Sequence, residues 1–283
     1  MIRKALIPVA GRGTRLMPVT SVVPKAMFPL VDGRNNIRSV LHVICQQAAS
    51  AGIESIGIVV SPWQRAMVQE YFKAVKQSNP DGLTGHIEYL VQPSPKGFGD
   101  AVMQATDFIG DEPFMLLLGD HIYVEDQNKP PCPAQVVMAF ESVGGVAMIG
   151  MQPVPTEELS RVGVATGSEI NKGIYRCYDF IEKPDPVTAQ QRLITQGLSE
   201  CSFLAHCGIY IFTPEIFACL QQLGNMIKTP DKEIELAEAQ NMLLKRYPNK
   251  YYLCKIDGRA HDIGTPEGYA LSQTAFRSKG TTA

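Results

Sequence analysis

A glycine-rich segment near the N-terminus contains residue types that bind phosphate. Gly11 and Gly13 lie close together, and Thr14 and Arg15 follow directly. Glycines at a strand end let backbone N–H groups approach phosphate oxygens, and an arginine can pair with phosphate through two parallel hydrogen bonds. Leu16 stands where GxGxxG requires its third glycine, so a dinucleotide fingerprint is disfavoured. Taken alone, the segment is equally consistent with an ordinary strand-to-helix turn.

Two further charged residues extend this chemistry. Lys25 stands between Pro24 and Pro29, and a stiff loop of this kind can aim an ammonium group. Asp120 follows an apolar run at 114–118. A carboxylate at the carboxyl edge of a sheet suits Mg²⁺, which takes one or two carboxylates plus phosphate oxygens. A solvated surface lysine and a turn aspartate are the alternative interpretations.

The elements that would position these residues alternate between strand and helix in the first half of the chain. Short apolar runs predict buried strands, and apolar residues at helical spacing predict helices between them. This alternation indicates βαβ units with a parallel sheet and right-handed crossovers. The predicted strands are 5–9, 55–60, 86–91 and 114–118, and the predicted helices are 37–51, 64–76 and 99–108.

The pattern changes after Asp120, where strand-like runs follow one another and predict a mixed sheet that continues the first one. The predicted strands are 146–151, 162–166, 175–180, 207–212 and 251–255, followed or separated by helices at 233–245 and 265–278. The polar tail 279–283 is predicted to fray. No linker is evident, so we predict one domain over 1–283 with halves at 1–125 and 126–283.

Composition restricts the possible partners and the compartment. The 283 residues are 45% hydrophobic and 19% charged, which is typical of soluble globular proteins. A net charge of −2 indicates neither a nucleic-acid partner nor an anionic membrane surface. Seven cysteines without a CxxC pair favour reduced thiols and therefore a cytoplasmic location. No run of about 18 apolar residues predicts a membrane span.

Several segments resemble motifs of a known family, and they occur along the chain in the order that the family has. AGRGTRLMPVTSVVPKAMFPLVD (residues 10–32) resembles the signature of the sugar nucleotidyltransferases and is most similar to that of bacterial UTP–glucose-1-phosphate uridylyltransferases. Residues 92–102 resemble the family's base-reading loop, 118–120 its metal-aspartate turn, and 180–184 its sugar-phosphate motif. Segments 207–210 and 232–236 also have counterparts, and the resemblance covers about residues 2–271. Chance is a poor explanation for so many motifs in order.

The resemblance implies an α/β, Rossmann-like nucleotide-binding fold with a mixed, mainly parallel central sheet flanked by helices. It also implies Mg²⁺ as cofactor and in-line attack of a sugar 1-phosphate on the α-phosphorus of a nucleoside triphosphate, with release of pyrophosphate. The substrates would be small molecules, namely UTP and glucose 1-phosphate. The first half would bind the nucleotide and the second half the sugar phosphate.

The family motifs assign roles to individual residues of this chain. The implied catalytic cations are Arg15, Lys25 and Lys183, the sugar-binding residues Gly163 and Glu182, and the metal ligands Asp120 and Asp262. The implied nucleotide-binding residues are Ala10, Gly11, Gly13, Thr14, Gln92 and Gly97. Asp262 has an alternative interpretation as a cap or turn residue ahead of the last helix. Glu182 and Lys183 have an alternative interpretation as a surface ion pair at a strand end. Asp100 departs from the family, which commonly has histidine there.

Other functions remain open from the sequence. The same chemistry with a thymidylyl, adenylyl or guanylyl group, or with another sugar, fits most of the motifs. Residues 119–123 resemble the corresponding turn of ADP-glucose pyrophosphorylases, whereas Lys25 between prolines favours uridylyl or thymidylyl transfer. A non-catalytic sugar-nucleotide-binding subunit would have lost the phosphate cations or the metal aspartate, and all of them are present. A homo-oligomer is compatible with the sequence.

Overall fold

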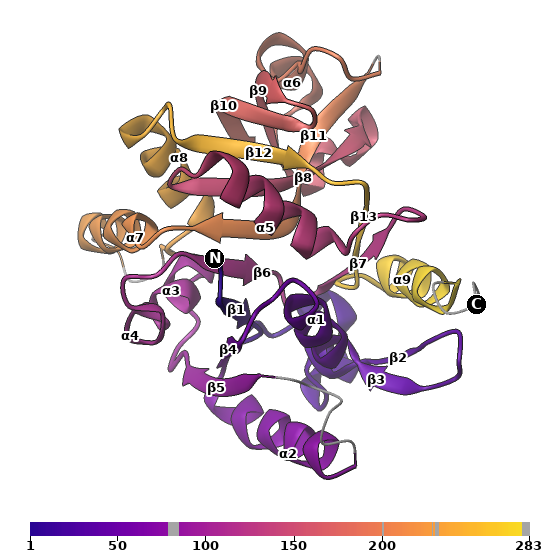
Figure 1. Ribbon diagram of the computed structural model, residues 1–283. Coiled ribbons are helices and arrows are strands. Elements are labelled where there is room, and N and C mark those ends of the chain that lie inside the picture. The colour runs from indigo at the N-terminus through magenta and orange to yellow at the C-terminus, as the bar shows by residue number, and fades with distance from the viewer. Residues whose placement is uncertain (79–84, 200, 228, 230–231, 279–283) are drawn as a thin grey trace.

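A computed structural model describes residues 1–78, 85–199, 201–227, 229 and 232–278. One nine-stranded sheet runs through the molecule and is covered by helices on both faces (Figure 1). Its strands in spatial order are β5 (His86–Val91), β4 (Ser55–Val60), β1 (Lys4–Pro8), β6 (Phe114–Leu117), β11 (Ser202–Phe212), β8 (Ala147–Pro155), β12 (Tyr251–Lys255), β10 (Ile174–Glu182) and β9 (Gly163–Asn171).

The first four strands form a parallel sheet in the order β5-β4-β1-β6. The chain therefore builds outward from β1 in one direction and then returns to add β6 on the other side of β1. This reversal is a topological switch point, and ligands of open α/β sheets bind outside the carboxyl ends of the strands at such a point. In the rest of the sheet, β11 and β10 run antiparallel to their neighbours, so the sheet is mixed but mainly parallel.

Alternate side chains of the central strands enter two different hydrophobic clusters. In β1, Ala5 and Ile7 face one cluster and Leu6 faces the other. A strand that is buried on both faces reads as a continuous apolar run, which is why the sequence revealed it. The first face packs against α1 (Val40–Ala49), α2 (Pro62–Ser78), α5 (Cys132–Val143) and α9 (Pro266–Ser278), and the second against α3 (Phe98–Met103), α4 (Thr106–Ile109), α7 (Glu215–Met226) and α8 (Leu236–Arg246).

Strand β11 connects the two parts of the sheet. Along one edge it pairs with β8, and residues 209–212 pair with β6. Earlier in the same strand, Leu204 and Ala205 pair with β9. The sheet therefore curls back on itself beyond β6, and the curled part brings the ends of β9 and β10 toward the carboxyl ends of β1 and β6. The short helix α6 (Pro186–Arg192) follows β10, and Ala189 lies in a third small cluster.

Two short ribbons lie outside the main sheet. In the first, β7 (His121–Glu125) pairs with β13 (Gly258–Asp262), and this register places Asp262 opposite His121. In the second, β2 (Pro29–Val31) pairs with β3 (Ile37–Ser39). The first ribbon joins segments that lie far apart in the sequence.

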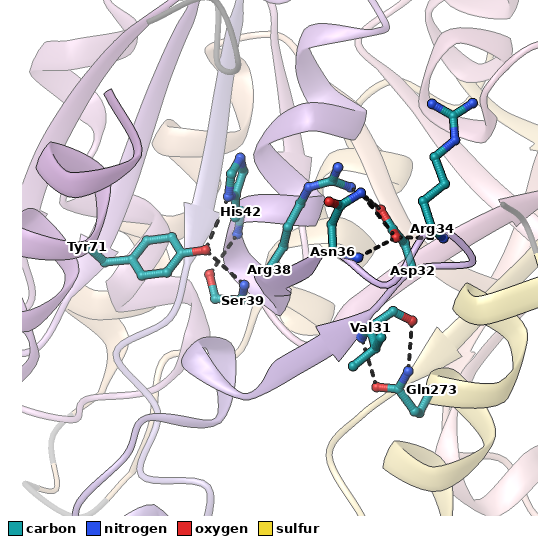
Figure 2. Close-up of polar contacts among 9 residues, drawn as sticks. All are labelled: Val31, Asp32, Arg34, Asn36, Arg38, Ser39, His42, Tyr71 and Gln273. Carbon is teal, nitrogen blue, oxygen red and sulfur yellow. Dashed lines mark hydrogen bonds and ion pairs between the residues drawn. The ribbon is translucent and has the colours of Figure 1, made fainter. Parts of the chain in front are cut away.

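Polar contacts fix the second ribbon (Figure 2). On α9, Gln273 donates its Nε2 to the Val31 carbonyl at 2.9 Å and accepts from the Val31 N–H at 3.2 Å. The Asp32 carboxylate accepts from the Arg34 and Asn36 N–H groups and so holds the turn. The last helix is thereby attached to the strand that directly follows the Lys25 loop.

The structure confirms most of the predicted strands and revises several helices. The runs 55–60, 86–91 and 251–255 are strands with the predicted bounds. The helix predicted over 37–51 begins only at Val40, because 37–39 pair with β2 and Ser39 caps the helix. The predicted helix 99–108 is two short helices, and the helix predicted from 233 begins at Leu236. Helices α5, α6 and α7 and both ribbons were not predicted, and the tail 279–283 lies outside the described residues.

None of the helices in the described part of the chain has the length and apolarity needed to cross a bilayer.

Candidate active site at the switch point

A cavity of about 930 Å³ opens at the carboxyl ends of β1 and β6, at the switch point of the sheet. The first half contributes residues that follow these two strands, and the second half contributes the ends of β9, β10 and β13. A pocket of this size holds a ligand of several hundred daltons. Both halves therefore line a single candidate site.

Asp120 lies at the centre of this cavity. It lies in the turn between β6 and β7, and its carboxylate contacts the Lys25 ammonium and accepts a hydrogen bond from His121 Nδ1 at 2.9 Å. These three side chains are between 16% and 19% exposed, so they are shielded but reachable. Lys25 begins a single 3-10 turn, Lys25–Met27, directly after Pro24. The stiff loop predicted from the prolines therefore aims the lysine at the carboxylate.

The charges around Asp120 determine its protonation state. Burial raises the pKa of this carboxyl, but the Lys25 charge and the contact with His121 outweigh burial and hold the pKa far below its usual range. Burial lowers the pKa of His121, whereas its hydrogen bond to Asp120 and the charges of Asp120 and Asp262 raise it, and the net shift is upward. Asp120 is therefore an anion across the physiological pH range.

Asp262 completes an acidic cluster. The β7–β13 register brings it to His121, and ligand atoms of Asp120, His121 and Asp262 all lie within 4.8 Å of one another. The Gly264 N–H donates to Asp262 Oδ1 at 2.6 Å and orients this carboxylate. Two carboxylates and an imidazole can hold a divalent cation, and the carboxylates suit a hard ion such as Mg²⁺. The cluster therefore fits a divalent metal.

Arg15 lies beside Asp262. A Cβ on Gly264 would stand 2.8 Å from Arg15 Nη2 and 2.8 Å from Asp262 Oδ1, so the glycine leaves room for both groups. Arg15 is in the 3-10 turn Thr14–Leu16. Gly13, the residue before this turn, has a left-handed φ of 64°. Only a residue that tolerates this φ can start the turn without strain. Gly13 therefore serves the loop geometry that directs Arg15 into the cavity.

The second half contributes a carboxylate and an ammonium to the lining of the cavity. Glu182 ends β10 and pairs with Gly163 at the start of β9. A Cβ on Gly163 would stand 2.7 Å from Glu182 Oε2, so only glycine leaves that carboxylate its place. Lys183 adopts a left-handed φ of 49°, which is uncommon for a residue with a side chain. Its N–H donates to the Val162 carbonyl at 3.1 Å, and its Nζ lies 3.5 Å from Glu182 Oε1.

The predicted base-reading residues form a connected group beside the cavity. Gln92 is buried, and its Nε2 donates to the Gly97 carbonyl at 3.1 Å and to Asp100 Oδ2 at 2.8 Å. Both hydrogens of the amide are thus used within the protein. Asp100, which departs from the family pattern, therefore orients Gln92. Gly97 has a φ of 102°, and a Cβ there would press on the backbone of Ile234.

Most predicted site residues meet in the cavity. Its lining includes Gly11, Arg15, Lys25, Asp120, Gly163, Glu182, Lys183 and Asp262. Ala10, Gly13, Thr14, Gln92 and Gly97 are described by the structure but are not part of that lining. The lining also includes residues to which the prediction gave no role in the site, among them His121, Arg161, His206, Arg259 and His261. His206 and Arg259 belong to none of the family motifs, so nothing in the sequence singled them out.

Comparison with known proteins agrees with this geometry. The family model described as nucleotidyl transferase matches residues 4–278. A UTP–glucose-1-phosphate uridylyltransferase of Bacillus subtilis (strain 168) is 34% identical over 97% of this chain and 91% of its own length. A Streptococcus pyogenes serotype M3 protein named UTP–glucose-1-phosphate uridylyltransferase 2 is 31% identical over 98% of this chain and 91% of its own.

The fold also matches solved structures. A UDP-glucose pyrophosphorylase complexed with UDP-glucose superposes with a TM-score of 0.81 at 28% identity, and the match covers 98% of each chain. A UTP-bound enzyme from Acinetobacter baumannii, at 23% identity and a TM-score of 0.75, shares the fold. The family match over nearly the whole chain, together with the cations and the acidic cluster of the cavity, leads to one assignment: this chain belongs to the nucleotidyl transferase family.

Proposed function

We propose that this protein is an enzyme that joins UTP to glucose 1-phosphate, forms UDP-glucose and releases pyrophosphate. The observation that carries the proposal is the division of charge within one cavity. Arg15, Lys25 and Asp120 reach it from the segments after β1 and β6, and Glu182 and Lys183 reach it from the end of β10. Two phosphate-bearing substrates can then meet between them. Residues 1–283 act as one nucleotidyltransferase domain in this proposal.

The first side would hold the triphosphate. Arg15 can grip a phosphate through two parallel hydrogen bonds, and Lys25 supplies a compact charge. The backbone N–H groups of Ala10, Gly11, Gly13 and Thr14 add donors along the loop. As the bond to the α-phosphorus breaks, negative charge grows on the leaving pyrophosphate, and Arg15 and Lys25 are placed to stabilise it.

The base preference follows from Gln92. Because Asp100 and the Gly97 carbonyl take both hydrogens of its amide, the amide oxygen is the atom that it offers to a base. An oxygen acceptor favours a base with a ring N–H, such as uracil or thymine, over adenine, whose corresponding ring nitrogen is an acceptor. This argument supports a nucleotide whose base has a ring N–H, as uracil, thymine and guanine do, and disfavours ATP.

The second side would hold the nucleophile. Glu182 can accept hydrogen bonds from sugar hydroxyls, and a sugar lacking one of them leaves a polar group unpaired. Lys183 can hold the phosphate of glucose 1-phosphate in line with the α-phosphorus. The attacking atom is a phosphate oxygen that is already anionic, so the reaction requires no strong general base.

Mg²⁺ fits the pair formed by Asp120 and Asp262. When bound, such an ion would neutralise negative charge at the reacting centre. The protein's contribution is to hold the two carboxylates close together through the β7–β13 ribbon and the Gly264 N–H.

We place the reaction in the cytoplasm, since the cysteine content favours a reducing compartment.

The experiment that tests this function is a turnover panel. The purified protein is given each of UTP, dTTP, ATP and GTP with glucose, mannose and N-acetylglucosamine 1-phosphates, and pyrophosphate release is measured with Mg²⁺ or EDTA. We expect the highest kcat/KM for UTP with glucose 1-phosphate and no release in EDTA. Binding of UDP-glucose without pyrophosphate release from any pair would instead indicate a non-catalytic sugar-nucleotide-binding subunit.

A further inference from the structure

His206 lies in the cavity but belongs to none of the motifs. It is in the first part of β11 and is 8% exposed. Its ring stacks on Phe180, with centroids 4.5 Å apart and planes at 13°, and meets the edge of Tyr210 at 5.7 Å. These two aromatic side chains fix the orientation of the imidazole. The ring is therefore rigid before any ligand arrives.

The polar atoms of this ring lack partners in the described part of the chain. Nε2 is buried and makes no hydrogen bond. Nδ1 borders the space above Gly163, since a Cβ on Gly163 would stand 3.3 Å from it and 2.7 Å from Glu182 Oε2. A buried polar group without a partner costs free energy, and a native protein rarely retains one without a reason. Of the two ring nitrogens, Nδ1 is the one that lies next to Gly163 in the cavity lining, where a ligand can reach it.

The charge state of the imidazole decides what it can bind. Burial lowers the pKa of His206 to about 3, so the ring is neutral and offers one donor and one acceptor. Nε2 makes no hydrogen bond to any residue that the structure describes, whereas Nδ1 and Glu182 Oε2 both border the position of a Cβ on Gly163. The proton is therefore better placed on Nδ1, where an oxygen can accept it.

A carboxylate and a neutral N–H donor that border the same space can both form a hydrogen bond with one hydroxyl group. The ionised carboxylate of Glu182 only accepts, so a sugar hydroxyl must donate its hydrogen to it. The oxygen of that hydroxyl then has lone pairs that need a donor. We propose that His206 is a specificity-determining residue whose Nδ1–H donates to the sugar hydroxyl held by Glu182. This inference rests on the proposed function, because it names a contact with the same sugar 1-phosphate.

A purely structural role makes a different prediction. If His206 only fills the stack between Phe180 and Tyr210, then phenylalanine would replace it without effect on the sugar. The experiment therefore compares His206→Phe, which keeps the ring and removes both nitrogens, with His206→Asn, whose amide nitrogen stands near the position of Nδ1. His42→Phe is the matched control, because His42 is also a buried histidine and it lies on α1, outside the cavity lining.

The readout is discrimination among sugars. The KM and kcat of each protein are measured for glucose 1-phosphate and for its 2-, 3-, 4- and 6-deoxy analogues at saturating UTP. The wild type should discriminate against the analogue that lacks the hydroxyl shared by Glu182 and His206. For that analogue, His206→Phe should reduce the ratio of kcat/KM for glucose 1-phosphate to kcat/KM for the analogue by roughly 3- to 10-fold, the size expected for one neutral hydrogen bond. The KM for UTP should be unchanged. His206→Asn should retain most of the discrimination, and His42→Phe all of it.

Two results would overturn the inference. The first is wild-type discrimination by His206→Phe for every analogue, and the second is an equal rise in the KM values of UTP and sugar phosphate, which would indicate a role in the fold alone. Failure of the proposed function would look different, since the wild type would then release no pyrophosphate from UTP and glucose 1-phosphate. If the wild type uses another sugar 1-phosphate, the same comparison is made with the deoxy analogues of that sugar. If it uses none, the inference falls with the function.

Discussion

The ammonium of Lys25 contacts the carboxylate of Asp120, which lies 95 residues later in the chain. The contact joins the loop after β1 to the turn after β6, the two strands on either side of the switch point. It places a cation and an anion where a triphosphate and its metal would meet. Breaking it selectively is the most direct test of the site.

Lys25→Met keeps the aliphatic stem and removes the charge. We expect kcat to fall by about 100-fold or more, because a preorganised cation facing developing charge contributes about 3–4 kcal/mol to transition-state stabilisation. The matched control is Lys129→Met, which breaks an exposed ion pair with Asp257 at 2.8 Å. Its kcat should remain within twofold of the wild-type value. Equal losses in the two variants would contradict a special role for Lys25.

Asp120→Asn and Asp262→Asn each remove one charge from the acidic cluster. We expect turnover in Mg²⁺ to fall by two or more powers of ten for Asp120→Asn, since a neutral amide is a poor ligand for a hard cation. Metal binding should be measured separately, by titrating Mn²⁺ in the presence of UTP and following its electron paramagnetic resonance signal. Asp262→Asn should weaken Mn²⁺ if this residue is a ligand. Unchanged Mn²⁺ affinity would leave Asp262 only as the acceptor of the Gly264 N–H.

Gly163→Ala introduces a methyl group that would stand 2.7 Å from Glu182 Oε2. The carboxylate must then move, so the KM for glucose 1-phosphate should rise at least tenfold while the KM for UTP changes little. Glu182→Gln should likewise raise the KM for glucose 1-phosphate far more than the KM for UTP. The control is Glu169→Gln, on the exposed part of β9. If UTP and the sugar phosphate weaken equally, Glu182 supports the structure of the site and does not select the sugar.

Lys183→Ala removes the proposed contact with the attacking phosphate. The loss should appear in the KM for glucose 1-phosphate, in kcat or in both, whereas UTP binding measured by calorimetry without the sugar phosphate should barely change. If turnover and KM stay normal, another cation must serve. Arg161 is then the next candidate because it lines the cavity, while Lys172 lies at the turn before β10, at the opposite end of that strand from Lys183.

His42 should make stability depend on pH. Burial and, to a smaller extent, the charge of Arg38 lower its pKa from 6.5 to about 4. The unfolded chain therefore binds a proton in this range that the folded chain excludes, and the free energy of unfolding should fall as pH drops from about 6.5 toward about 4. The slope from this residue approaches about 1.4 kcal/mol per pH unit. Urea unfolding of the wild type and His42→Gln measures it as the difference in slope.

The matched control for this measurement is His86→Gln, because His86 is an exposed histidine on β5. That variant should unfold with the same pH dependence as the wild type. If His42→Gln also keeps the full slope, the acid sensitivity arises from another group.

The sequence predicted the parts of the fold and site that local patterns encode. Strands buried on both faces appear as apolar runs, and Asp120 stands out because it directly follows such a run. Asp262 was less certain, because its position depends on the pairing of β13 with β7, which no local pattern indicates. His206 was missed because a single histidine in an apolar strand has no periodic signal, and only the fold shows that it lies beside Glu182. The role of Asp100 likewise required the contact with Gln92.

The β7–β13 ribbon also has a consequence for the timing of synthesis. Asp120 emerges from the ribosome well before Asp262, and β13 is among the last elements of the chain. A nascent chain, or a fragment cut before residue 258, carries the loop after β1 and the turn after β6 but lacks the second carboxylate and the Gly264 N–H that orients it. On the proposed role of Asp262, such a fragment would hold a divalent ion and a triphosphate less tightly than a chain that carries both carboxylates.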